Sequence, residues 1–131
     1  MLDTNMISAL MKNDEKVRAK FEATVDSKKT VFMSGVSHYE IKRGLLAVNA
    51  TRKMKIYDEI RKQFQMLFLD NEEIFEKAAE IHADLKRRGE LIQDADIFIA
   101  TTALLQNLIL VSNDSHFQRI SDLTTENWIR D

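Results

Sequence analysis

The feature that most constrains the fold is an alternation of short apolar runs with longer stretches of helical periodicity. The clearest apolar run covers residues 108–112, with the sequence Leu-Ile-Leu-Val-Ser. A strand that is covered on both faces needs such a continuous run, whereas a strand with one wet face alternates. Two further apolar runs, at 30–34 and 66–69, stand between helical stretches. This alternation predicts an α/β fold with a parallel sheet.

Apolar residues at helical spacing predict the elements between these strands. Longer helices are expected at about 14–27, from 37 onward, at about 51–65, at about 71–88 and from about 94 onward, after a short helix that follows residue 3. The first strand consists of residues 1–2 alone, although a central strand usually has about five residues. Either the natural start lies upstream of Met1 or this strand is unusually brief. Residues 127–129 are expected to form an edge strand.

Length and composition limit the class of protein. The 131 residues, 44% of them hydrophobic, predict a single domain over 1–131. The sequence has no apolar stretch long enough to span a bilayer and no secretory signal, so a cytoplasmic protein is expected. The absence of cysteine excludes disulfides, zinc–thiolate sites and thiol catalysis. With no proline and three glycines, the chain has no glycine-rich phosphate loop, and its helices must be stopped by Asn, Asp and Ser.

Acidic residues follow the predicted strands at the points where helices begin. Asp3, Glu40 and Asp114 come within a few residues of strand ends, and Asp96 opens a very apolar helix. The carboxyl ends of parallel strands meet at one crevice, so these four side chains are expected to converge. Four carboxylates in one crevice repel each other unless a cation is bound. Mg²⁺ and Mn²⁺ prefer such oxygen ligands and commonly act on phosphate groups, so the acids predict a site of this kind.

Each acid also has a simple structural explanation. Asp3 can cap a helix, and Ser37 with Glu40 matches a capping box. Asp94 and Asp96 lie at a helix start, where the helix dipole favours negative charge. Capping accounts for each acid alone, but it does not explain why all four crevice positions carry acids rather than Ser or Thr.

The three histidines are not expected to form a metal site. His82 lies on an apolar helix face and is interpreted as a core residue, whereas His38 and His116 are interpreted as surface residues. No serine has a plausible His–Asp relay, so a hydrolase triad is not expected.

The charge distribution leaves two interpretations open. The formal net charge is −2, but without the four crevice acids 17 acids face 19 bases, a balance of +2. Residues 41–62 carry seven bases and only two acids. These bases either form solvated helix faces or bind the phosphates of a nucleic acid.

Several short motifs together resemble the PIN-domain ribonucleases, and more narrowly the VapC toxins of bacterial toxin–antitoxin pairs. The motifs are Asp3-Thr4-Asn5 and the stretches 37–44, 96–103, 110–117 and 123–128, in the same order and spacing as in that family. The resemblance covers essentially the whole chain. It implies a single-domain α/β/α sandwich with a mostly parallel sheet, metal-dependent endoribonuclease activity with Mg²⁺ or Mn²⁺, restraint by a cognate antitoxin, and a homodimer.

The resemblance also implies roles for individual residues. Asp3, Glu40, Asp96 and Asp114 match the acidic tetrad of the family, as metal ligands or, for Glu40, as a group that orients water. The resemblance also marks Asp94 as an extra acid, and Thr4, Asn5, Ser112 and Asn113 as small polar residues that line the site. Among the bases of residues 41–62, Lys42 and Arg43 could hold the flanking RNA backbone. Met6, Leu10 and Met11 are expected to be exposed, and they could either take part in self-association or receive an antitoxin segment.

Two other functions are compatible with parts of the sequence. Phosphoryl transfer through an aspartyl intermediate could start at Asp3, but such enzymes usually have a second Asp where this chain has Asn5. A catalytically inert PIN-fold binding module would explain the helices and their apolar surfaces. It would not explain the complete acidic set.

Overall fold

Parallel pairing of short strands forms the centre of the molecule. The computed structural model describes residues 1–129. Strand β1 (Phe32–Ser34) pairs with β2 (Gln65–Leu67), and β3 (Leu110–Val111) pairs with β4 (Thr125–Glu126), both in parallel. Leu2 makes single parallel bridges to Met33 and Val111, and it thereby joins the two pairs into one layer. At the predicted first strand, the described residues form only these isolated bridges of Leu2.

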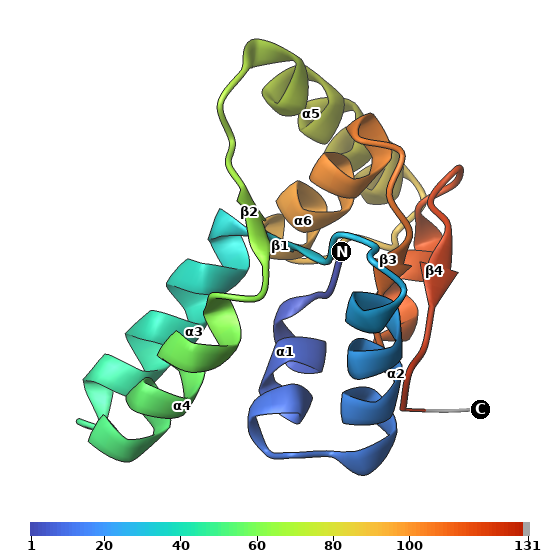
Figure 1. The fold of residues 1–131 in the computed structure, drawn as a ribbon. Coiled ribbons are helices and arrows are strands. Elements are labelled where there is room, and N and C mark those ends of the chain that lie inside the picture. Colours follow the sequence, from blue (N-terminus) through green and yellow to red (C-terminus); the bar gives the residue numbers. More distant parts are fainter. Residues whose placement is uncertain (130–131) are drawn as a thin grey trace.

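Helices cover both faces of this layer (Figure 1). Their bounds are α1 Thr4–Met11, α2 Glu15–Asp26, α3 Gly35–Ala47, α4 Thr51–Arg61, α5 Glu72–Arg87 and α6 Asp94–Leu105, with a 3₁₀ helix η1 at Ser115–Arg119. Leu2, Met33 and Val111 pack with α1 to α4 on one face of the sheet. Phe32 and Leu110 pack with α5 and α6 on the other face. Because successive strand residues point to opposite faces, this alternation builds an α/β/α sandwich, which confirms the predicted fold class.

The ends of several helices depend on left-handed backbone conformations. Asn13, Asn49 and Asn107 follow α1, α3 and α6 with φ of 61°, 51° and 53°. Gly89 follows α5 with φ of 70°, as a C-terminal glycine does. Asparagine tolerates this region better than most residues. The chain therefore terminates most of its helices without glycine and without proline, as the composition predicted.

Several predicted boundaries differ from the structure, and the strand expected over 108–112 covers only Leu110–Val111. Helix α3 begins at Gly35, not at residue 37, because the Ser34 side chain accepts the N–H of Val36 and caps the helix. Ser37 is buried inside the helix, so the capping box does not form. The last strand lies at Thr125–Glu126 rather than at 127–129, where Trp128 is instead buried in the core formed with α1 to α4.

No helix within residues 1–129 is both long enough and apolar enough to cross a membrane.

Candidate active site

The four predicted acids line one cleft at the carboxyl edge of the sheet. Asp3 precedes α1, Asp96 lies in the first turn of α6, and Asp114 directly precedes η1. Glu40 projects from α3 into the same cleft. Residues far apart in the sequence converge because the strand ends do, as the parallel sheet predicted.

Asp3 is both a helix cap and a cleft acid. Its Oδ1 accepts the N–H of Met6 at 2.8 Å, and its Oδ2 accepts the Ser112 hydroxyl at 2.6 Å. Only 4% of the residue is exposed, and this burial raises the pKa of the Asp3 carboxyl to about 6, with smaller contributions from Asp96 and Asp114. A carboxylate in this position is costly to ionise without a nearby cation.

Asp96 and Asp114 form the more open part of the cleft. Burial raises the pKa of Asp96, and the charges of Asp114 and Glu40 raise it further. Asp114 caps η1 by accepting the N–H of His116 at 2.9 Å, and its own N–H donates to the Ser112 hydroxyl at 2.9 Å. Side-chain donor atoms of Asp96, Asp114 and His116 all lie within 4.8 Å of one another. Such a set could hold a metal ion.

Glu40 is held by a short chain of hydroxyl groups. The Thr4 hydroxyl donates to Glu40 Oε1 at 2.7 Å, and Thr4 Oγ1 lies 2.9 Å from Ser37 Oγ. Because a carboxylate only accepts and Thr4 has one hydroxyl hydrogen, Ser37 supplies the hydrogen of the second bond. Arg43 Nη2 lies 3.8 Å from Glu40 Oε2. Sequence reasoning missed this use of Ser37, although its three-residue spacing from Glu40 places both on one helix face.

The remaining predicted site residues divide into two groups. Thr4 and Asn5 line the cleft, and the Ser112 hydroxyl donates to Asp3 Oδ2. Three other predicted site residues, Asp94, Asn113 and Lys42, are not among the residues that line the cleft. Asp94 Oδ1 lies 3.8 Å from His82 Nδ1, and Asn113 Oδ1 accepts a hydrogen bond from Asn127 at 2.9 Å. Lys42 Nζ lies 3.8 Å from Asp58 Oδ1 on α4. Arg43 is close to the cleft because its Nη2 lies 3.8 Å from Oε2 of Glu40, which lines the cleft. The Arg43 guanidinium also lies over the Tyr39 ring, 5.1 Å from the ring centre.

The histidines differ from their predicted environments. His82 is not a core residue, since 42% of its side chain is exposed beside Asp94. His38 pairs with the buried Tyr57 through its Nδ1, 2.6 Å from the hydroxyl oxygen, and the two rings stack. His116 is exposed, as predicted, but it lines the cleft with its Nδ1 3.1 Å from Asp114 Oδ1. The only indication in the sequence that His116 lies at the cleft is its position two residues after Asp114.

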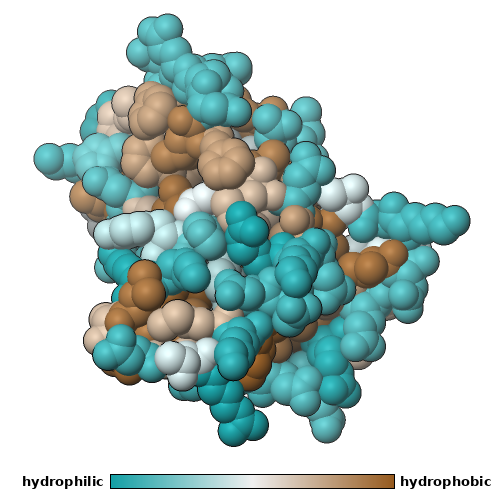
Figure 2. Space-filling view, turned by 60° about the vertical axis from the view of Figure 1, so that its left-hand side comes forward, coloured by the Kyte–Doolittle hydropathy of each residue, from teal (hydrophilic) through white to brown (hydrophobic). Residues whose placement is uncertain are grey.

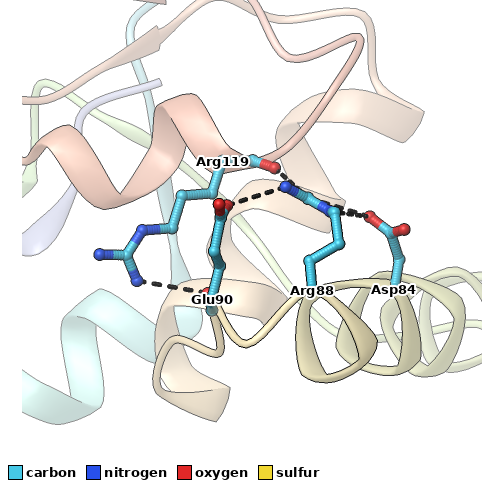
Figure 3. Close-up of polar contacts among 4 residues, drawn as sticks. All are labelled: Asp84, Arg88, Glu90 and Arg119. Atoms are coloured by element: carbon cyan, nitrogen blue, oxygen red, sulfur yellow. Dashed lines mark hydrogen bonds and ion pairs between the residues drawn. The ribbon is translucent and has the colours of Figure 1, made fainter.

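Arg88 and Arg119 connect the segment that follows α5 to the 3₁₀ helix η1 (Figure 3). Arg88 donates to Asp84 at 3.0 Å, to Glu90 at 2.8 Å and to the carbonyl of Arg119. Arg119 donates in return to the carbonyl of Glu90 at 3.2 Å. These contacts tie the segment after α5, where residues 91–93 line the cleft, to η1, which carries His116. No pattern in the sequence predicts this link.

An apolar groove opens beside the acidic cleft, between α1, α3 and α4. Thr4 and Glu40 border both hollows, and the groove is further lined by Met11, Ile41, Leu45 and Ile56, with Lys12, Arg52 and Lys53 among its polar residues. Figure 2 shows hydrophobic side chains gathered in separate upper and lower areas of one face, with hydrophilic residues between them. Met6 and Leu10 are buried, so the prediction that they are exposed is wrong.

Comparisons with known proteins agree with this geometry. A family model described as "PIN domain" matches residues 1–123. Ribonuclease VapC1 from Haemophilus influenzae is 30% identical over 132 residues, which cover 99% of this chain and 98% of that protein. The structure of VapBC-1 from nontypeable Haemophilus influenzae matches with a TM-score of 0.85 and 30% identity over 98% of this chain and 96% of that chain. VapBC2 from Rickettsia felis, bound to a promoter DNA fragment, matches in fold with a TM-score of 0.90 and 23% identity over 98% and 97%.

Proposed function

The chain belongs to the PIN-domain family and groups with its VapC ribonucleases, and we propose that it is a metal-dependent endoribonuclease toxin restrained by an antitoxin. The observation that carries this proposal is the convergence of Asp3, Glu40, Asp96 and Asp114 on one cleft. Family membership agrees with the resemblance inferred from the sequence motifs.

The donor set of the cleft suits a hard divalent cation. Asp96 and Asp114 present oxygens close enough to share one ion, and Asp3 and Glu40 border the same space. Burial raises the pKa of Asp3 and of Asp96, and neighbouring acids raise both further, so a bound cation would favour the ionised forms of these carboxyl groups. We propose that Asp3, Asp96 and Asp114 hold Mg²⁺ or Mn²⁺, with Glu40 as a further ligand or as a group that orients water.

The proposed reaction is hydrolysis of an RNA phosphodiester bond. A bound divalent ion would polarise the scissile phosphate and lower the pKa of the attacking water. Glu40, held in place by Thr4, would accept a hydrogen bond from that water and direct it in line with the leaving oxygen. Asn5 lines the cleft and can donate to a phosphate oxygen, and Arg43, which lies 3.8 Å from Glu40, would contact the flanking backbone. Water attack at phosphorus with departure of the 3′ oxygen leaves a 5′-phosphate and a 3′-hydroxyl.

The partners follow from the same proposal. RNA is the substrate, and the chain acts in the cytoplasm with it. The cognate antitoxin would cover the apolar groove beside the cleft, where it could reach Thr4 and Glu40. We further propose a homodimer, in keeping with exposed aromatic side chains such as Phe68 and Phe75, which are 58% and 48% exposed.

The two other functions are not favoured. Phosphoryl transfer through Asp3 is not favoured because such enzymes usually have a second Asp two residues on, where this chain has Asn5. A purely binding module would have no use for four converging carboxylates, which cost stability.

The experiment that tests the function is cleavage of total cellular RNA by the purified protein, with Mn²⁺, with Mg²⁺ and with a chelator. Discrete fragments that need the metal, and that are absent with Asp96→Asn, are expected. Asp70→Asn is the matched control, because Asp70 is exposed and outside the cleft. Equal cleavage by the wild type and by Asp96→Asn, with both proteins folded, would contradict the proposal.

A further inference from the structure

The group of possible metal ligands in the acidic cleft includes one nitrogen ligand, the imidazole of His116, beside the carboxylate oxygens of Asp96 and Asp114. We propose that the imidazole of His116 is a nitrogen ligand to the divalent ion held by Asp96 and Asp114. This inference rests on the proposed metal-dependent function and concerns which atoms and which ions that site accepts. It assigns a role in the site to a residue that the sequence pattern had placed among ordinary surface residues.

The backbone at Asp114 fixes the position of His116. Asp114 Oδ1 accepts the N–H of His116 at 2.9 Å, so the first turn of η1 folds back over this carboxylate. As a result His116 Nδ1 lies 3.1 Å from the same oxygen. An imidazole held in this way needs little reorganisation to bind an ion that Asp114 also binds.

The spacing of the three donors matches one coordination sphere. Atoms from Asp96, Asp114 and His116 all lie within 4.8 Å of one another. Octahedral ligands about 2.1 Å from an ion are separated by roughly 3.0 Å when adjacent and roughly 4.2 Å when opposite. The observed separations therefore require only small side-chain movements to close around one ion.

A second histidine–aspartate pair provides the contrast. His82 Nδ1 lies 3.8 Å from Asp94 Oδ1, and the side chain of His82 is 42% exposed, close to the 47% of His116. This pair borders a different hollow, lined by apolar residues of α5 and α6, and no third donor joins it among the described residues. Both histidines have a neighbouring Asp, but only His116 also has a second carboxylate, that of Asp96, close enough to share a metal ion among the described residues.

A nitrogen ligand changes which ions the site prefers. Carboxylate and water oxygens suit Mg²⁺, whereas imidazole favours transition-metal ions such as Co²⁺ and Ni²⁺ over Mg²⁺. Mn²⁺ accepts both kinds of ligand and is paramagnetic, so it can report the bound nitrogen directly. The site should therefore bind transition-metal ions more tightly than an all-oxygen site of the same charge.

The first test is pulsed electron paramagnetic resonance of the Mn²⁺-loaded protein. Echo modulation from a coordinated ¹⁴N is expected in the wild type and in His82→Gln, and it should be lost in His116→Gln. Labelling histidine with ¹⁵N should change the signal in the wild type. Bound Mn²⁺ without nitrogen modulation in the wild type, or modulation that persists in His116→Gln, would overturn the proposal and would instead assign His116 to hydrogen bonding with Asp114.

The second test is calorimetric titration with Co²⁺ and with Mg²⁺. His116→Gln should weaken Co²⁺ binding by about 10-fold or more and change Mg²⁺ binding far less, while His82→Gln should leave both unchanged. Equal effects on both ions would contradict a nitrogen ligand. A protein that binds none of these ions would overturn the metal dependence itself, whereas metal-dependent RNA cleavage without a nitrogen signal would overturn only the role of His116.

Discussion

At the scale of single residues, Asp3 combines two demands that oppose each other. Its hydrogen bonds to Met6 and Ser112 fix the start of α1, but its burial raises its pKa from 3.8 to about 6. Because the folded state favours the protonated form, this group contributes most stability below pH 3.8, and that contribution is lost as pH rises toward 6. Above pH 6 the cost reaches at most about 3 kcal/mol.

The substitution Asp3→Asn should therefore stabilise the metal-free protein at pH 8, by about 1–2 kcal/mol. Asparagine keeps an oxygen that can accept the N–H of Met6, and it carries no charge to bury. The gain should shrink at pH 4, where the wild-type carboxyl is protonated in the folded state. Urea unfolding in chelator at the two pH values measures this effect, with the exposed-site variant Asp70→Asn as control. A loss of stability at pH 8 would show that the charge of Asp3 is not the dominant cost.

Thr4 is a positioning residue for Glu40. Thr4→Val should lower kcat by about 10-fold to 100-fold, the usual effect of removing a group that orients a site residue, with a much smaller change in KM. Thr4→Ser should restore most of the rate because it restores the hydroxyl that donates to Glu40 at 2.7 Å. Steady-state cleavage of a defined RNA gives both constants. Full activity of Thr4→Val would mean that Glu40 needs no support from Thr4.

At the scale of elements, the rim of the cleft depends on contacts between α5 and η1. Arg88→Ala removes the donors to Asp84, Glu90 and the carbonyl of Arg119. Amide hydrogen exchange should become faster in residues 89–93 and 115–119 and stay unchanged in α1 and α2. Arg87→Ala, on the same exposed last turn of α5, is the control. Uniform acceleration across the chain would indicate global destabilisation rather than release of the rim.

The sequence predicted the elements better than their ends. The apolar run 108–112 identified the central strand, although only Leu110–Val111 form it and Ile109 is 45% exposed, and the acids after the strands identified the cleft. The start of α3 was misplaced because Ser34 and Ser37 are both good caps, and only the fold shows which one is buried. The links Thr4–Ser37 and Arg88–Arg119 join residues more than 30 positions apart. Such contacts leave no periodic pattern in the sequence.

At the scale of the whole molecule, metal binding is coupled to folding because only the folded chain brings the four cleft acids together. The chain carries a net charge of −2, and four of its acids converge on one cleft. An ion that binds only the folded state stabilises it by about 2.7 kcal/mol at a concentration 100 times its Kd. For a domain of this size we expect a rise in Tm of roughly 5–10 °C on adding Mn²⁺ at pH 8.

This rise in Tm should be smaller at pH 5, because protons compete for the same carboxylates. Below pH 6 Asp3 is protonated in the folded protein, so a metal ion must displace a proton in order to use it. Thermal unfolding with Mn²⁺ and with chelator at pH 5 and pH 8 gives the comparison, and Asp96→Asn should abolish the shift at both values. Equal shifts at the two pH values would mean that Asp3 is not a ligand. The ion would then depend on the more open carboxylates, Asp96 and Asp114.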